Sequence, residues 1–191
     1  MKPRRLMWVF VIALLALARK VEASVVYTPV NVTISGNGYL LLDLNHDHKT
    51  DFTILVLGKR ILCTTGPGSF GEVVVTPTQG NGVVSAWPGG TWAAALASGI
   101  EIDSRPSFYR AQALMTQYST CLYPPHTNYG AWLEATNRYL GLQFQIKGQR
   151  HYGWARLTIY PGRAGPIVAL TGFAYETIPG QGIKTGQISG S

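Results

Sequence analysis

The stretch YLGLQFQIKGQRHYGWARLTIY, residues 139–160, carries the clearest strand pattern in the chain. Apolar residues alternate with small or polar ones on both sides of Lys147-Gly148-Gln149, at Leu140, Leu142, Phe144 and Ile146 and then at Ala155, Leu157 and Ile159. Strict alternation is typical of a strand with one face on a core. A short connection containing Gly favours a tight turn between two such runs. The stretch therefore predicts a β-hairpin from Leu140 to Tyr160.

The same two-residue period recurs elsewhere, and Gly, Asn and Pro residues separate the runs. Further apolar or β-branched runs lie at residues 30–34, 40–44, 52–56, 72–76 and 167–175. The chain has 22 Gly and 11 Pro, but only 13% charged residues, whereas helical domains carry more Glu, Lys and Ala on their exposed faces. Short strands with such punctuation predict an all-β fold, either an antiparallel β-sandwich or a jelly-roll.

Three segments depart from the strand pattern. Residues 92–98 are expected to form one short helix, capped by Thr91 at its start and by Gly99 at its end. Residues 104–130 have no clear period and are expected to form a long loop excursion. The Gly- and Ser-rich residues 181–191 are expected to be a flexible tail. This leaves residues 24–180 as a single domain.

Residues 1–23 have the composition of a signal peptide. Basic residues at Lys2, Arg4 and Arg5 precede an uncharged apolar run of 13 residues, Leu6 to Ala18. A membrane-spanning helix needs about 20 apolar residues. Val21 and Ala23 place small side chains where a signal peptidase reads them, so cleavage is expected before Ser24, with an uncleaved anchor as the alternative. The rest of the chain should then be secreted, periplasmic or extracellular, without stable membrane insertion.

The charge of the chain is concentrated in that leader. Five of the 16 Lys and Arg residues and one of the nine acids lie in residues 1–23, so the net charge falls from +7 to about +3 on cleavage. The remaining basic residues form no run, whereas a nucleic-acid surface needs a basic cluster. We therefore expect no nucleic-acid partner.

The chain contains two cysteines, Cys63 and Cys121. In an oxidising compartment an even number of cysteines suggests one disulfide. Two buried free thiols are the alternative. Neither cysteine has neighbours that would lower its thiol pKa, so catalysis by cysteine is the weakest option.

The acidic loop Asp43-Leu44-Asn45-His46-Asp47-His48-Lys49-Thr50-Asp51 is the strongest chemical motif. Oxygen-bearing side chains stand at loop positions 1, 3, 5 and 9 (Asp43, Asn45, Asp47 and Asp51), and the Lys49 carbonyl at position 7 could add a ligand. Ca²⁺ binds six to eight oxygens, and this alternation is the spacing of EF-hand-like calcium loops. The loop therefore predicts a structural Ca²⁺ site.

The loop resembles the calcium loops of integrin-type and FG-GAP/VCBS-type β repeats and of dockerins. Integrin-type loops lie between two strands and end at the position 9 Asp, as Leu40 to Val56 does. Two positions depart from the EF-hand pattern: His48 replaces the usual Gly, and Ile54 the usual Glu. With His48 at the sharp bend, the expected affinity is that of weak extracellular modules, about 10⁻⁴ to 10⁻³ M. A solvated hairpin without metal and a transition-metal site using His46 and His48 remain as alternatives.

The C-terminal block resembles uncharacterised exported bacterial β-rich proteins of the PEP-CTERM-associated kind, without their sorting tail. The resemblance rests on YLGLQF (139–144), HYGWARL (151–157) and AYETIPG (174–180), and it implies no activity. In the same block, a core facing Ala155, Leu157 and Ile159 would leave Tyr152, Trp154, Arg156 and Tyr160 on the opposite face. Such a face could stack on a polysaccharide, or the rings could simply pack.

No catalytic motif is present. The sequence has no His-Glu-x-x-His, Gly-x-Ser-x-Gly or phosphate-binding Gly loop. Outside the loop and the leader the acids are Glu72, Glu101, Asp103, Glu134 and Glu176. The leading expectation is a non-catalytic exported β domain with one Ca²⁺ and one disulfide. A lectin-like binder of a polysaccharide or cell-surface component is the alternative, and a glycoside hydrolase using a carboxylate pair is the third.

Overall fold

The computed structural model is all-β and describes residues 24–64, 66–121, 129–162 and 165–190. Its larger sheet has six strands in the order β1 (Val25–Ile34), β11 (Gly165–Glu176), β10 (Gln149–Gly162), β9 (Arg138–Ile146), β5 (Gly82–Val84) and β7 (Phe108–Tyr109). The second sheet has four strands, β2 (Tyr39–Leu42), β3 (Phe52–Cys63), β4 (Gly66–Pro77) and β8 (Ala113–Ser119). A two-stranded ribbon pairs β12 (Ile183–Lys184) with β6 (Glu101–Ile102). All strand pairs are antiparallel.

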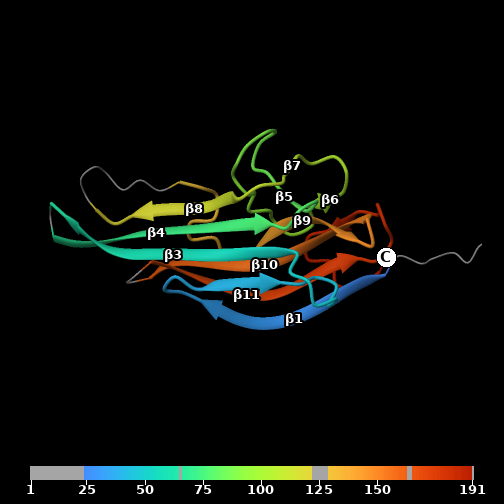
Figure 1. The fold of residues 1–191 in the computed structure, drawn as a ribbon, viewed down its shortest axis with the longest axis horizontal. Helices are drawn as coiled ribbons and strands as arrows, with labels where there is room; N and C mark the ends of the chain where they lie inside the picture. Colours follow the sequence, from blue (N-terminus) through green and yellow to red (C-terminus); the bar gives the residue numbers. More distant parts are fainter. Residues whose placement is uncertain (1–23, 65, 122–128, 163–164, 191) are drawn as a thin grey trace, which may run out of the picture.

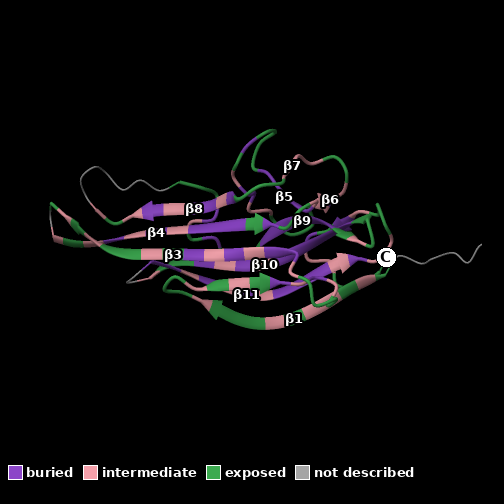
Figure 2. Ribbon diagram, viewed as in Figure 1, coloured by how far each residue is buried: buried purple, intermediate pink, exposed green. Residues whose placement is uncertain are grey.

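The two larger sheets share one apolar core. Ile54, Val56 and Val73 of the four-stranded sheet belong to the same buried cluster as Leu142 and Leu157 of the six-stranded sheet. Figure 1 shows β3 and β4 running alongside β10 and β11, and Figure 2 shows buried positions along these strands. The arrangement is consistent with a β-sandwich.

The hairpin predicted from residues 140–160 is confirmed. Strands β9 and β10 pair from Ile146 opposite Gln149 onward, and the turn between them is Lys147-Gly148. Both turn residues have positive φ, 52° and 77°, as a type I′ hairpin turn requires. Leu140, Leu142, Phe144, Ala155, Leu157 and Ile159 are buried in the shared core, on the face that the alternation predicts.

A second, smaller cluster covers the opposite face of the six-stranded sheet. It contains Tyr139, Tyr152 and Trp154 from the sheet, together with Ala94, Ile102 and Ile183 from the segments that lie over it. The six-stranded sheet is therefore buried on both faces around β10, and its outward-facing aromatic residues pack against the chain itself.

The predicted helix at residues 92–98 is wrong. The segment is extended: Ala93, Ala94 and Leu96 donate backbone N–H bonds to Leu114, Val84 and Tyr139, each at 2.9 Å. About two helical turns could not compete with these hydrogen bonds to neighbouring strands, because so short a helix is marginal without packing.

Two further expectations are corrected. The excursion at 104–130 contains strands β7 and β8, which were missed because their alternation is short; residues 122–128 of it lie outside the described part. The expected flexible tail is ordered from Gln181 to Gly190. In it, Ile183 is buried, and the Thr185 hydroxyl donates to Ala97 O at 2.7 Å and accepts from Ile100 N at 2.8 Å.

The expected disulfide is present between Cys63 and Cys121, whose Cα atoms are 5.3 Å apart. Cys63 ends β3 at the tip of the β3–β4 hairpin, and Cys121 follows β8, so the bond joins two strands that flank β4. Gly68 fits against both sulfur atoms, where a Cβ would collide with Cys63 Sγ. The expected signal segment, residues 1–23, lies outside the described residues. None of the described segments forms a helix that could span a membrane.

Reducing the disulfide should lower stability without changing the fold. Closing a loop between residues 58 positions apart removes unfolded-state entropy equivalent to about 4 kcal/mol. We expect urea unfolding with reductant to show a lower midpoint than without it, and a Cys63→Ser/Cys121→Ser variant to match the reduced protein and ignore reductant. An unchanged midpoint on reduction would contradict this prediction.

Candidate functional site

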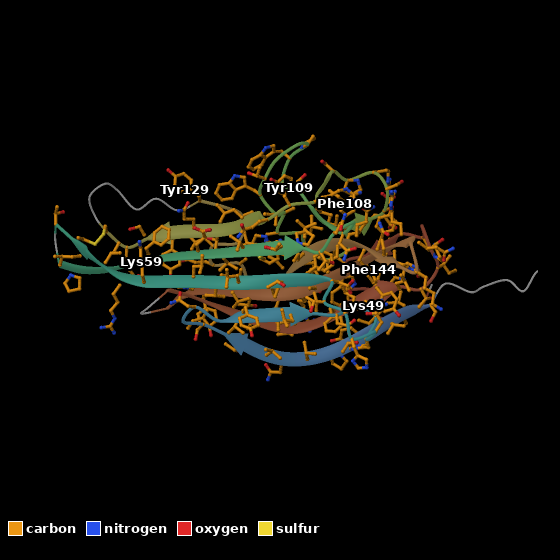
Figure 3. The ribbon with its side chains drawn as sticks, in the orientation of Figure 1. Lys49, Lys59, Phe108, Tyr109, Tyr129 and Phe144 are labelled. Atoms are coloured by element: carbon orange, nitrogen blue, oxygen red, sulfur yellow. A yellow bond between two sulfur atoms is a disulfide. The ribbon has the colours of Figure 1, made fainter. Side chains whose placement is uncertain are left out.

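The acidic loop connects β2 to β3, as the sequence predicts. The Asp51 N–H donates to Leu42 O at 2.8 Å and closes the loop across its base, while Leu44 is fully buried in the shared core. Figure 3 labels Lys49 in this loop, at the end of the molecule where the chain terminates. The loop is therefore anchored at both ends.

The loop folds around its own carboxylates. Four backbone N–H groups donate to them: Asp47 and His48 to Asp43 at 3.2 and 2.8 Å, Lys49 to Asp47 at 3.0 Å, and Leu44 to Asp51 at 2.9 Å. Each carboxylate offers about four lone-pair sites, so these bonds leave acceptor capacity on every aspartate. The three aspartates thus bind the backbone of their own loop, but Asp47 is exposed, Asp43 is half-buried and only Asp51 is buried.

The backbone of the loop bends where calcium loops bend. His46 and His48 have φ values of 58° and 66°, in the left-handed region. His48 holds position 6, where Gly is usual because the chain turns sharply there. The chain thus makes the turn with a non-Gly residue, at a conformational cost of about 1 kcal/mol.

Asp51 ties the loop to both sheets. Only 8% of Asp51 is exposed, and the Asn81 side chain donates to its carbonyl at 3.2 Å and to its Oδ1 at 3.3 Å. Asn81 Oδ1 in turn accepts from the N–H of Gln145 in β9, at 3.2 Å. Burial raises the pKa of the Asp51 carboxyl to about 6, and the charges of Asp43 and Asp47 push it in the same direction.

Asn45 carries an oxygen without a partner. Its side-chain Oδ1 is buried and accepts no hydrogen bond. An unsatisfied buried acceptor costs roughly 1–3 kcal/mol, so such atoms are rare and call for an explanation. Asn45 stands between Asp43 and Asp47 in the loop, at position 3 of the predicted ligand series.

The donor set suits a hard cation better than a transition metal. Among the described residues, no three His, Cys, Asp or Glu side chains converge as a ligand group. Asp43, Asp47 and Asp51 therefore do not form a ligand group as they lie, and a cation would have to draw them together with the Asn45 oxygen and a backbone carbonyl, which are ligands that Ca²⁺ accepts. His46 Nε2 instead forms a hydrogen bond with Thr28 Oγ1 at 3.0 Å, and its ring packs near Phe173. His48 is exposed.

A cleft of about 450 Å³ lies beside the loop. Asp47, Asp51 and Asn81 line it, together with two lysines, Lys49 and Lys147. The Asp47 carboxylate is thus accessible to solvent from this side, whereas Asp51 is largely buried. The lysines place positive charge at the same opening, and they would weaken rather than assist the approach of a cation.

Comparisons of the chain with models of protein families, with curated proteins and with solved structures find no match.

Of the two interpretations of the aromatic face, packing is confirmed for Tyr152 and Trp154, and the four residues do not form an exposed platform. Tyr152 and Trp154 are each 1% exposed, and the Trp154 indole N–H donates to Gln187 O at 3.2 Å. Arg156 donates from Nε to Thr171 Oγ1 at 2.7 Å, and of the four residues only Tyr160 is exposed. The rings are buried because residues from 94–108 and 183–187 cover this face, which strand alternation alone cannot reveal.

A different aromatic group is exposed, and the sequence reasoning missed it. Trp87 and Tyr129 are about half exposed, and Trp92 lies between them with ring centroids 6.4 Å from Trp87 and 6.3 Å from Tyr129. These rings line a cavity of about 340 Å³, and Figure 3 shows Tyr129 on the outer side of β8. Paired backbone bonds between Tyr129 and Gln117 of β8, at 2.8 and 2.9 Å, bring this distant residue beside the two tryptophans.

Two of the candidate catalytic acids lie on one cavity. Glu101 and Glu176 both line a space of about 370 Å³. Glu176 Oε1 accepts backbone N–H bonds from Ser24 at 3.2 Å and Ile178 at 2.9 Å. Asp103 pairs instead with Arg105 at 2.6 Å, and Glu134 is exposed. The Glu176 carboxylate therefore accepts hydrogen bonds from the backbone at the start of β1 and just after β11.

The raised pKa of Asp51 predicts how the stability of the protein in excess chelator depends on pH. A group whose pKa is about 6 when folded and about 3.9 when unfolded binds protons more tightly in the folded state. Its contribution is therefore complete below about pH 4 and is lost as the pH rises through about 6. We expect melting temperatures in excess chelator to fall across this window, and the Asp51→Asn variant to lack that component. A wild-type profile that matches the variant would contradict the shift.

Proposed function

We propose that the chain is an exported, non-catalytic β-sandwich domain whose Asp43–Asp51 loop binds one structural Ca²⁺. The observation that carries the proposal is the buried, unpartnered Asn45 Oδ1 within a loop of three aspartates. A Ca²⁺ ion would satisfy that oxygen, and it would offset the burial and the smaller repulsion from Asp43 and Asp47 that raise the pKa of Asp51.

The backbone of the loop supports the same proposal. Ca²⁺ takes six to eight oxygens at about 2.3–2.6 Å and tolerates irregular geometry. The three carboxylates would have to converge on the ion. Asp43, Asn45, Asp47 and Asp51 would then supply side-chain oxygens, and Lys49 its carbonyl. His48 already adopts the positive φ that this kind of loop needs at position 6. The ion would stiffen the β2–β3 connection and, through Asn81 and Gln145, its junction with the six-stranded sheet.

Export is supported by two independent features. Residues 1–23 have the basic, apolar and small-residue segments of a signal peptide, and the Cys63–Cys121 disulfide suits an oxidising compartment. The resemblance of the C-terminal block to exported bacterial proteins points the same way. Weak Ca²⁺ affinity, about 10⁻⁴ to 10⁻³ M, is adequate for an extracellular module.

Calcium should stabilise the protein through the loop. With Ca²⁺ in about twentyfold excess over its dissociation constant, linkage gives about 1.8 kcal/mol, which raises the melting temperature by a few degrees. The protein in CaCl₂ should therefore melt above the protein in chelator. The Asp43→Asn/Asp47→Asn variant should lose the difference.

Two variants make the calcium test specific. Asp103→Asn removes one acidic charge outside the loop, from a carboxylate that pairs with Arg105, and should keep the full Ca²⁺ response. His48→Gly relieves the positive φ and should bind Ca²⁺ more tightly in a calorimetric titration. Equal melting temperatures with Ca²⁺ and with chelator in the wild-type protein would reject the calcium site.

A second candidate function is binding of a polysaccharide chain at Trp87, Trp92 and Tyr129. The observation that favours it is a row of three rings, two of them half exposed, along one cavity. Gly90 and Gly130 support the row, because a Cβ at either position would collide with the neighbouring Trp87 or Trp92 ring. Large exposed rings fixed in this way can stack on the apolar faces of sugar rings.

Removal of one exposed ring should abolish this binding. We expect Trp87→Ala to lose retardation in affinity electrophoresis through gels that contain soluble polysaccharides, since it deletes one end of the row. Tyr160→Ala is the matched control, because Tyr160 is an exposed ring outside the row and its loss should leave retardation unchanged. Equal retardation of the wild-type protein and Trp87→Ala would exclude the aromatic row as the site.

A further inference from the structure

Glu176 is a buried acid at the end of β11. Its exposed fraction is 1%, and in the antiparallel pairing of β1 with β11 it lies opposite Val25 at the start of β1. Its Oε1 accepts the Ser24 N–H at 3.2 Å and the Ile178 N–H at 2.9 Å, while the Ser24 carbonyl accepts from Thr177 N at 3.0 Å. The backbone N–H of Ser24 is thus bonded to the Glu176 carboxylate, and its carbonyl to the residue that follows β11.

No basic side chain balances the charge of Glu176. Within the described ranges the only ion pair joins Arg105 to Asp103. Glu101 and Lys184 line the same cavity as Glu176 without pairing with it, and His151 Nδ1 meets the backbone carbonyl of Glu176 rather than its carboxylate. An unpaired buried carboxylate is costly even when backbone groups bond to it, so a cationic group placed beside Glu176 would stabilise it.

We infer that cleavage between Ala23 and Ser24 supplies that cation, and that Glu176 binds the new α-ammonium group of Ser24. Hydrolysis breaks the peptide C–N bond with one water. The hydroxyl goes to the Ala23 carbonyl carbon and a proton goes to the Ser24 nitrogen, which leaves a carboxylate and, at neutral pH, an α-ammonium. The nitrogen that becomes charged is the one that already lies 3.2 Å from Glu176 Oε1.

Processing would therefore change a hydrogen bond from a neutral N–H to the carboxylate into a buried ion pair. The gain is the Coulombic attraction between the two charges, which is stronger in a buried site than in water. The ion pair would fix the start of β1, the edge strand of the six-stranded sheet, to the end of β11. The inference rests on the export part of the proposed function, and it is independent of Ca²⁺ binding.

The ion pair has a defined pH dependence. An α-amino group ordinarily has a pKa of about 7.7–8.0, and a carboxylate partner favours its charged form. The added stability is therefore complete below about pH 7 and is lost as the pH rises through the pKa of the paired amine. Glu101, Lys184 and His151 also face this region, so each comparison is made between chains that share them.

The test compares three N-termini on the chain from Ser24 to Ser191: a free α-amine, an acetylated amine, and a Gly-Ala extension before Ser24. All three keep the Ser24 N–H donor, but only the first places a charge there. Near pH 7 the free amine should melt about 3 °C or more above the other two, and the difference should disappear at about pH 10.

The same three chains carrying Glu176→Gln separate the ion pair from a general effect of the N-terminus. In that variant the three melting temperatures should coincide. Equal melting temperatures in the wild-type background, or a difference that persists in Glu176→Gln, would overturn the inference.

Two further measurements keep the inference testable if Glu176→Gln does not fold. With Glu176 present, the free Ser24 amine should react with an acylating reagent about tenfold more slowly than the free amine of the Gly-Ala extension, since ion pairing lowers the fraction of free amine; equal rates would overturn the pairing. Separately, mass spectrometry of the exported full chain should give Ser24 as its first residue. A different first residue would overturn processing at this bond, whereas the melting comparison reports on the ion pair alone.

Discussion

The β10 strand is buried on both of its faces, and the positions of the other elements follow from that constraint. One face carries Ala155, Leu157 and Ile159 into the core shared with the four-stranded sheet. The other carries Tyr152 and Trp154 into the second cluster, against Ile102 and Ile183. A strand with two apolar faces needs cover on both, so the chain must place a second sheet on one side and the β6–β12 ribbon on the other.

That double burial also explains which parts of the fold the sequence could predict. Alternation at Leu140–Ile146 and Ala155–Ile159 is local, so it located β9, β10 and the turn at Lys147-Gly148 correctly. It could not tell whether Trp154 faces water or a second layer, because the cover comes from Gln187 and Ile183, far along the chain. The helix predicted at residues 92–98 was wrong for the same reason, because the backbone partners of this segment, Leu114 and Tyr139, are distant in sequence.

The candidate sites likewise combine features that are local in sequence with features that depend on tertiary contacts. The spacing of oxygen-bearing residues from Asp43 to Asp51 is a local property, and it identified the loop and its strand–loop–strand setting. The contribution of Asn81, which bonds to Asp51 and to Gln145, is a tertiary one that no local pattern contains. The ring row of Trp87, Trp92 and Tyr129 likewise exists only because Tyr129 pairs with Gln117 in β8.

The two proposals about cations have a common physical basis. Asp51 and Glu176 are buried at 8% and 1% exposure, and neither forms an ion pair within the described part of the chain. A buried charge without a partner is stable only if it is neutralised or if a cation reaches it. For Asp51 the proposed cation is Ca²⁺, at the concentrations of an extracellular medium; for Glu176 it is the α-ammonium that an export peptidase exposes. On this reading both charges would be balanced only after the chain has left the cytoplasm, so the chain would reach its full stability in the compartment where its disulfide also forms.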